Sequence, residues 1–121
     1  MERQNIYKII GNAEEVLEKL GKIIISFEES KKTPPKQDVQ LLKSINRVLG
    51  LLEENPFIGN HVPRNLWPKE YETLPNLFRM ELSQFWRLLY YVQGNDVIIV
   101  SVVFEICDHD KYNDIFGYKK K

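Results

Sequence analysis

The feature that most constrains the fold is a nearly uninterrupted apolar run near the end of the chain, VIIVSVVF at residues 97–104. Most of its residues are β-branched, and such residues favour extended backbone over helix. A strand with almost no polar alternation is typical of a central strand that other elements cover on both faces. The run therefore predicts a buried strand at the middle of a sheet.

Two segments before this run carry the alternation of a half-buried strand. In residues 77–82 and 87–92, two sets of side chains alternate from one residue to the next. This period of two is the side-chain period of extended backbone. Gly94–Asn95, between the second segment and the apolar run, is typical of a tight turn. The stretch 77–112 is therefore expected to form three consecutive antiparallel strands.

The first half of the chain has helical periodicity instead. Apolar side chains recur three and four residues apart in two segments, at Val16, Leu20, Ile23, Ile24 and Phe27, and then at Leu41, Leu42, Ile45, Val48, Leu49 and Leu52. The segment 30–36 holds two prolines and separates them, which predicts an αα-hairpin. Asn12 with Glu15 resembles a capping box for the first helix, and Thr33 is expected to cap the second.

Together these patterns predict one α+β domain spanning residues 1–121, with an N-terminal αα-hairpin packed on a three- to four-stranded antiparallel sheet. Residues 3–10 could be a short strand or the start of the first helix. The proline-rich segment 57–75 is expected to be an irregular loop that packs on the core through its aromatic residues.

Composition limits the functions that this domain can have. The chain holds 17 basic and 17 acidic residues, so any contact with nucleic acid would have to come from a local cluster. Its single cysteine, Cys107, excludes an internal disulfide, and no Cys/His spacing suggests a metal or other cofactor. A reducing cytoplasm is the natural location. No signal-peptide pattern and no apolar run of about 18 residues is present, so no membrane association is expected.

Three segments, taken in order, resemble the RelE/ParE toxin superfamily of prokaryotic type II toxin–antitoxin systems, in its archaeal-like form. They are ENPFIGNHV at 54–62, LFRMELSQFWRLLYYV at 77–92 and VIIVSVVFEICDHDKY at 97–112. The resemblance implies a RelE/ParE-like fold and a ribosome-dependent endoribonuclease that cleaves messenger RNA by attack of a ribose 2′-OH on the adjacent phosphate. It also implies an antitoxin partner that contributes an amphipathic helix.

The same resemblance implies which residues carry the chemistry. Arg87, His109 and Tyr112 would be catalytic, with Arg87 on the phosphate and the other two as acid/base or stacking groups. Histidine suits proton transfer because it titrates near neutral pH. Arg79 and Lys111 would bind substrate as well. Trp86 is a third substrate-binding candidate because its ring could stack on RNA, and its simplest interpretation is a core residue.

Other interpretations remain open at this point. Glu81 lies where active members are often basic, and FEICDHD lacks an arginine that active members often carry. The alternative is a catalytically silent scaffold that binds an antitoxin or another protein, or a gyrase inhibitor of the ParE type. On these interpretations Arg87 pairs with Glu81 or Glu105, and Tyr112 only anchors the end of the chain.

Overall fold

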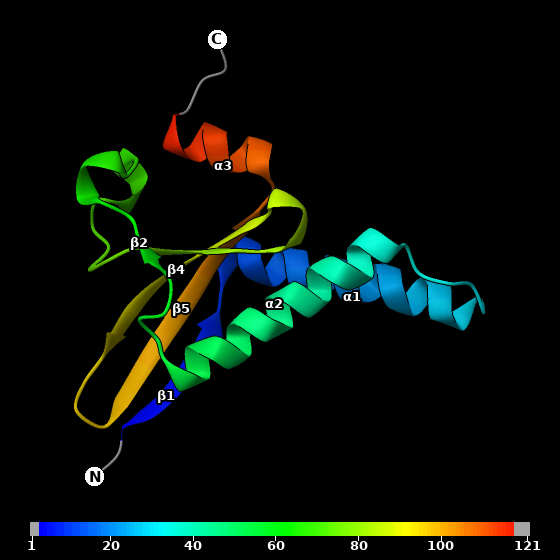
Figure 1. The fold of residues 1–121 in the computed structure, drawn as a ribbon, viewed down its shortest axis with the longest axis horizontal. Helices are drawn as coiled ribbons and strands as arrows, with labels where there is room; N and C mark the ends of the chain where they lie inside the picture. Colours follow the sequence, from blue (N-terminus) through cyan, green and yellow to red (C-terminus); the bar gives the residue numbers. More distant parts are fainter. Residues whose placement is uncertain (1–2, 118–121) are drawn as a thin grey trace.

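The computed structural model describes residues 3–117, and within them the chain forms three α-helices and a five-stranded sheet (Figure 1). The helices are α1 (Gly11–Glu29), α2 (Lys36–Glu54) and α3 (His109–Phe116). The strands are β1 (Gln4–Ile9), β2 (Asn60–His61), β3 (Phe78–Glu81), β4 (Arg87–Gly94) and β5 (Ile98–Cys107). The prediction of an α+β domain is confirmed.

The sheet has the order β1-β5-β4-β3-β2 and is mixed rather than antiparallel. β2 to β5 pair antiparallel, as expected for the segment 77–112, but β1 runs parallel to β5. Residues 4–9 thus form a strand, which was one of the two interpretations of that segment. The expected three to four strands become five in the described chain, because residues 60–61 also join β3 as a short edge strand.

α1 and α2 cover one face of the sheet. Figure 1 shows α1 leaving the sheet and α2 returning alongside it, so the linker at 30–35 reverses the chain. α2 buries all but one of the apolar positions that the periodicity predicts, because only Leu42 stays partly exposed. In α1 only Leu20 of the five predicted positions is fully buried, and the other four are partly exposed. The buried side chains pack against residues from β3, β4 and β5. This helix-side core includes Leu20, Leu41, Ile45, Val48, Leu52, Leu88, Tyr90, Val103 and Ile106.

Both predicted helix caps are wrong. The residue before α1 is Ile10, in extended conformation, and the residue before α2 is Pro35; neither provides a side-chain cap. Thr33 lies two residues before that proline, too early to reach the first free amides of α2. Asn12 instead accepts a hydrogen bond from the backbone amide of Ile106 at 3.0 Å. The side chain thus joins the start of α1 to β5.

The opposite face of the sheet carries the segment 62–77 and α3. Their contact with the sheet forms a second core of Val62, Leu77, Leu89, Cys107 and Tyr112, flanked by Trp67, Tyr71, Phe104, Ile115 and Phe116. The segment 57–75 packs on the core as expected, but it is more regular than predicted. It contains β2 and two short 3₁₀ turns, at Arg64–Leu66 and Lys69–Tyr71.

A β-bulge in β5 shapes this second face. Leu89 pairs with Glu105 and Tyr90 with Val103, so Phe104 has no partner on β4. A bulge of this kind bends the strand and redirects its side chains. Phe104 contacts the ring of Tyr71 at 5.2 Å, and the neighbouring Glu105 reaches α3. The bulge therefore turns two consecutive side chains of β5 toward the face that holds Arg87.

Candidate functional site

Two arginines from neighbouring strands lie against one tyrosine from α3. Arg79 Nη1 on β3 donates a hydrogen bond to the Tyr112 hydroxyl at 3.0 Å. The guanidinium carbons of Arg79 and Arg87 lie 5.7 and 5.4 Å from the centre of the Tyr112 ring. Cation–π contacts at this range contribute about 0.5–2 kcal/mol each. We call these three residues the arginine–tyrosine cluster.

The register places this cluster on the face away from α1 and α2. Side chains two residues apart on a strand share a face. Arg87 is two residues before Leu89, which belongs to the core beneath the segment 62–77 and α3, and Arg79 lies directly opposite Leu89. Both arginines therefore project from the inner strands of the sheet toward the end of the chain.

Arg87 is mostly enclosed by its own turn. Its Nη1 donates to the carbonyl oxygen of Phe85 at 2.7 Å, and its side chain is 12% exposed. Glu81 lies opposite it in register, but the Nε–Oε1 distance of 3.9 Å is at the outer limit of an ion pair and Glu81 is 62% exposed. Such a pair contributes little. Arg87 is thus positioned mainly by a carbonyl group and the Tyr112 ring.

Each arginine of the cluster has an unused donor. The Nε atoms of Arg79 and Arg87 are buried, and neither has a hydrogen-bond acceptor among the described residues. Buried donors are rarely left unpaired, because the lost hydration is costly. An anionic oxygen is the acceptor that best satisfies a guanidinium group. The described residues therefore leave part of the hydrogen-bonding capacity of both guanidinium groups unused.

Tyr112 orients the arginines from a buried position. It is 4% exposed, and its ring lies 4.6 Å from that of Phe116. A tyrosine enclosed in this way cannot offer a ring face to a nucleobase while α3 stays docked. The anchoring role that the sequence left open for Tyr112 is present, together with the contact to Arg79.

Lys111 forms an ion pair with a glutamate of the same domain. Its Nζ lies 3.1 Å from Oε2 of Glu105, which is buried beside the bulge. Burial raises the pKa of the Glu105 carboxyl above its usual value, and Lys111 counteracts part of that rise. The lysine therefore stabilises the docking of α3 and is not directed at the two arginines.

The structure places His109 beside Phe85, and Trp86 on the other face of the sheet from the cluster. His109 is exposed at the start of α3, with Nε2 3.2 Å from Asn113 Nδ2 and its ring 6.3 Å from that of Phe85. Trp86 packs against the helix-side core, because consecutive residues of extended backbone point to opposite faces. Of the six predicted residues, the structure brings together Arg79 and Arg87, each of which contacts Tyr112.

Sequence reasoning missed Phe85. This residue is the second of two in the turn between β3 and β4, and it is 73% exposed. Gln84 and Phe85 both have positive φ angles, of 58° and 64°. The only signal was the short gap between two alternating segments, and the turn lacks the glycine or asparagine that marks such a connection.

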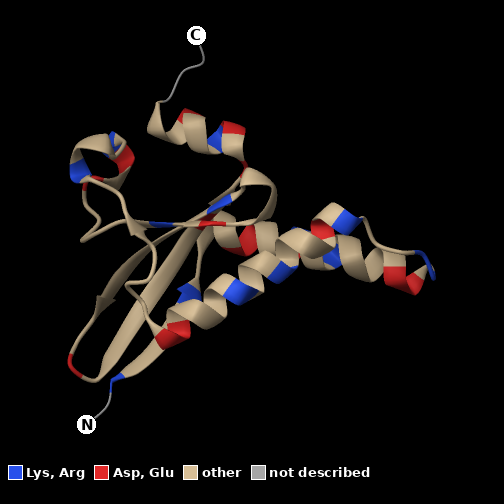
Figure 2. Ribbon diagram, in the orientation of Figure 1, with Lys and Arg blue, Asp and Glu red and all other residues tan. Residues whose placement is uncertain are grey.

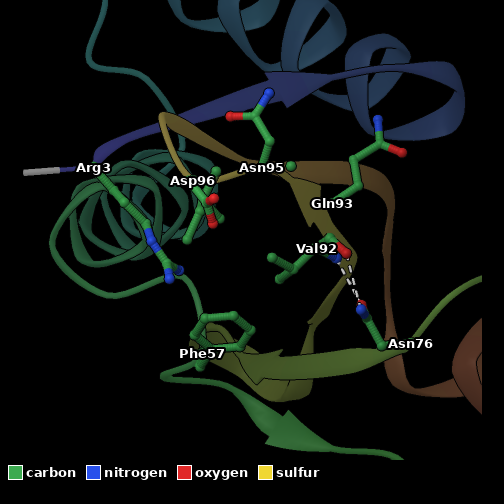
Figure 3. A pocket seen from close by; sticks show the side chains of 9 residues that line it. Arg3, Phe57, Asn76, Val92, Gln93, Asn95 and Asp96 are labelled. Carbon is green, nitrogen blue, oxygen red and sulfur yellow. Dashed lines mark hydrogen bonds between the residues drawn. The ribbon is translucent and has the colours of Figure 1, made fainter.

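A separate hollow lies at the other end of the sheet, beside the β4–β5 turn. Its volume is about 370 Å³, and Figure 3 shows Arg3, Phe57, Asp96 and Asn95 around its rim. Val92 and Ile99 line it and belong to the helix-side core, so it opens away from the arginine–tyrosine cluster. The two features are independent.

Charge is dispersed over the domain. In the view of Figure 2, basic and acidic segments are interspersed over α1, α2 and the segment 62–77. Among residues 3–117, no group of three His, Cys, Asp or Glu side chains is placed to hold a metal ion. No helix in that range combines the length and hydropathy needed to cross a bilayer. Comparison with family models, curated proteins and solved structures finds no match to this chain.

Proposed function

We propose that the chain is the toxin of a type II toxin–antitoxin pair and that it cleaves messenger RNA on the ribosome. The observation that supports this proposal is that Arg79 and Arg87 both lie against Tyr112, each with a buried Nε that has no hydrogen-bond acceptor among the described residues. A phosphodiester supplies the anionic oxygens that these donors lack. The order of the strand motifs, which resembles the RelE/ParE superfamily, points to the same substrate.

The protein must accept a proton from the attacking hydroxyl, donate a proton to the leaving oxygen and stabilise the charge that develops on the phosphate. The ribose 2′-OH loses a proton and attacks the adjacent phosphorus, and the 5′-oxygen of the next nucleotide leaves and takes up a proton. The products are a 2′,3′-cyclic phosphate and a 5′-hydroxyl. Arg79 and Arg87 would stabilise the charge that develops on the phosphoryl oxygens. His109, exposed at the start of α3, would transfer the protons.

A groove between the helices supports the antitoxin partner. Val16, Leu20, Ile23, Leu41 and Trp86 line a hollow of about 270 Å³ between α1 and α2, with Lys19 and Asp38 at its edge. An apolar groove with a polar edge is the surface on which an amphipathic helix docks. We propose that the antitoxin helix binds there, on the face opposite the arginine–tyrosine cluster.

The test is cleavage of a defined message in a reconstituted translation system. Wild-type protein is expected to cut the message, and Arg87→Ala is expected to slow cleavage by about 10²- to 10³-fold, the typical loss when one charge-stabilising donor is removed. Arg47→Ala, at an exposed position of α2, is the matched control and is expected to cut normally. Thermal unfolding of each variant confirms that it is folded. Intact message at micromolar wild-type protein, beside an active family toxin, refutes the proposal.

A second function is favoured by the enclosure of the site. Arg87 is 12% exposed and Lys111 is paired with Glu105, so much of the charge on this face is engaged within the domain. We propose as the alternative a silent scaffold that binds an antitoxin or another protein. Harmless, high-yield expression together with intact message supports the scaffold. Growth arrest that Arg87→Ala relieves supports the nuclease.

A further inference from the structure

The turn between β3 and β4 holds a large aromatic side chain in a backbone conformation that disfavours it. Trp86 N donates to Ser83 O at 3.2 Å and Leu82 N to Trp86 O at 2.9 Å, which closes a tight turn with Gln84 and Phe85 at its centre. Two positive φ angles in such a turn select Gly or Asn. Strained residues of this kind often belong to functional sites. Phe85 gains little burial in return, because it is 73% exposed.

Three hydrogen bonds hold this turn in position. Arg87 Nη1 donates to the Phe85 carbonyl at 2.7 Å. On the other side, Gln84 Nε2 donates to the carbonyl of Gln37 at 3.0 Å and Ser83 N to Ser44 Oγ at 3.2 Å, both on α2. The Phe85 ring therefore projects into solvent from a turn that hydrogen bonds hold to Arg87 on one face of the sheet and to α2 on the other.

The surroundings of Phe85 match the chemistry of an unpaired nucleotide. The guanidinium group that holds its carbonyl also contacts Tyr112, and the exposed His109 ring lies 6.3 Å away. An exposed aromatic ring beside an arginine is the combination that binds single-stranded nucleic acid, because the ring stacks on a base and the arginine contacts the backbone.

We propose that Phe85 stacks on an unpaired base of the RNA strand whose phosphate contacts Arg87. This inference rests on the proposed nuclease function and adds a base-binding position to it. The ligand class is a nucleotide of single-stranded RNA, and stacking accepts any base because every base has a flat π-face. The buried Tyr112 then orients the arginines, and Phe85 supplies the stacking surface.

The experiment measures binding of labelled full-length protein to ribosomes programmed with a 2′-O-methylated A-site codon, which cannot be cleaved. Phe85→Ala and Phe85→Leu are expected to weaken binding by at least about fivefold, whereas Phe85→Trp retains it. Phe57→Ala, an exposed aromatic on the helix side of the sheet, is the matched control and is expected to bind as wild type. On a message with abasic A-site positions, the Phe85→Ala loss is expected to disappear.

The outcomes distinguish a failure of the stacking role of Phe85 from a failure of the proposed nuclease function. Wild-type protein that neither binds nor cleaves overturns both. Cleavage by wild type with unchanged binding by Phe85→Ala overturns the stacking role alone. Retention of binding by Phe85→Leu, or an equal Phe85→Ala loss on the abasic message, would show that Phe85 makes an apolar contact with a protein, and it too overturns the stacking role.

Discussion

The backbone at Phe85 predicts a reversal of the usual order of alanine and glycine. Alanine is normally the more stabilising of the two, because glycine loses about 0.5–1 kcal/mol more conformational entropy on folding. At a φ of 64°, however, any residue with a Cβ pays roughly 1–2 kcal/mol that glycine avoids. Subtracting the middle values of these two ranges leaves Phe85→Gly more stable than Phe85→Ala by roughly 0.75 kcal/mol.

The chain contains its own control for this comparison. Gly50 lies in α2, and a Cβ added there meets no atom within 4 Å. Gly50→Ala is therefore expected to stabilise the domain by about 0.5–1 kcal/mol, which is the opposite sign for the same pair of residues. The comparison at residue 85 uses two variants that both lack the ring, so the lost contacts of Phe85 cancel.

Urea unfolding followed by circular dichroism measures the free-energy difference at residue 85 and the one at residue 50. In thermal unfolding, each difference corresponds to about 2–4 °C in midpoint temperature for a domain of this size. If Phe85→Ala proves as stable as or more stable than Phe85→Gly while Gly50→Ala behaves as expected, the left-handed turn is absent in solution and the argument for a strained, functional Phe85 fails. If the order holds, Phe85→Gly is also expected to bind programmed ribosomes as weakly as Phe85→Ala.

Three further predictions test the structure itself. Tyr90→Phe removes a buried hydroxyl that donates to the Pro56 carbonyl and accepts from the Gly59 amide, and it is expected to cost about 1–3 kcal/mol in urea unfolding. A loss below a few tenths of a kcal/mol would contradict that bridge. Burial raises the pKa of the Cys107 thiol to about 12, so native protein at pH 8 should react with a thiol reagent far more slowly than unfolded protein, and equal rates would place it at the surface. Burial also raises the pKa of Glu105, so its ionisation opposes folding as the pH rises above 4.5. Glu105→Gln should therefore gain stability relative to wild type between acidic and neutral pH, and a difference that stays constant with pH would refute this.

Local patterns predicted the elements, whereas contacts between distant segments decided how those elements join. The period of two in residues 77–92 and the helical spacing in the first half correctly located β3, β4, α1 and α2. The parallel pairing of β1 was not predictable from its own residues, because an edge strand on a mixed sheet needs no special pattern. Asn12 matched the pattern of a helix cap, but its side chain accepts a hydrogen bond from the backbone amide of Ile106 in β5.

The candidate site divides in the same way. Arg79 and Arg87 share a face because of strand register, which the alternation of their neighbours indicates. The contact of both arginines with Tyr112 depends on how α3 docks, which involves the Lys111–Glu105 ion pair and a bulge that leaves no sequence signature. Trp86 could have been excluded beforehand, because it is adjacent to Arg87 in extended backbone and so faces the other way.

The pairing of the first strand with the last has a consequence for synthesis of the protein. Gln4 of β1 pairs with Ile98 of β5, so the ribosome must add 94 further residues after Gln4 before its partner is synthesised. At a translation rate of about 5–20 residues per second, that interval is roughly 5–20 s. During it, the apolar sides of α1 and α2 have no sheet to cover, and nascent chains in this state are expected to recruit chaperones. Closure of the sheet is then a late event, completed only as β5 clears the exit tunnel.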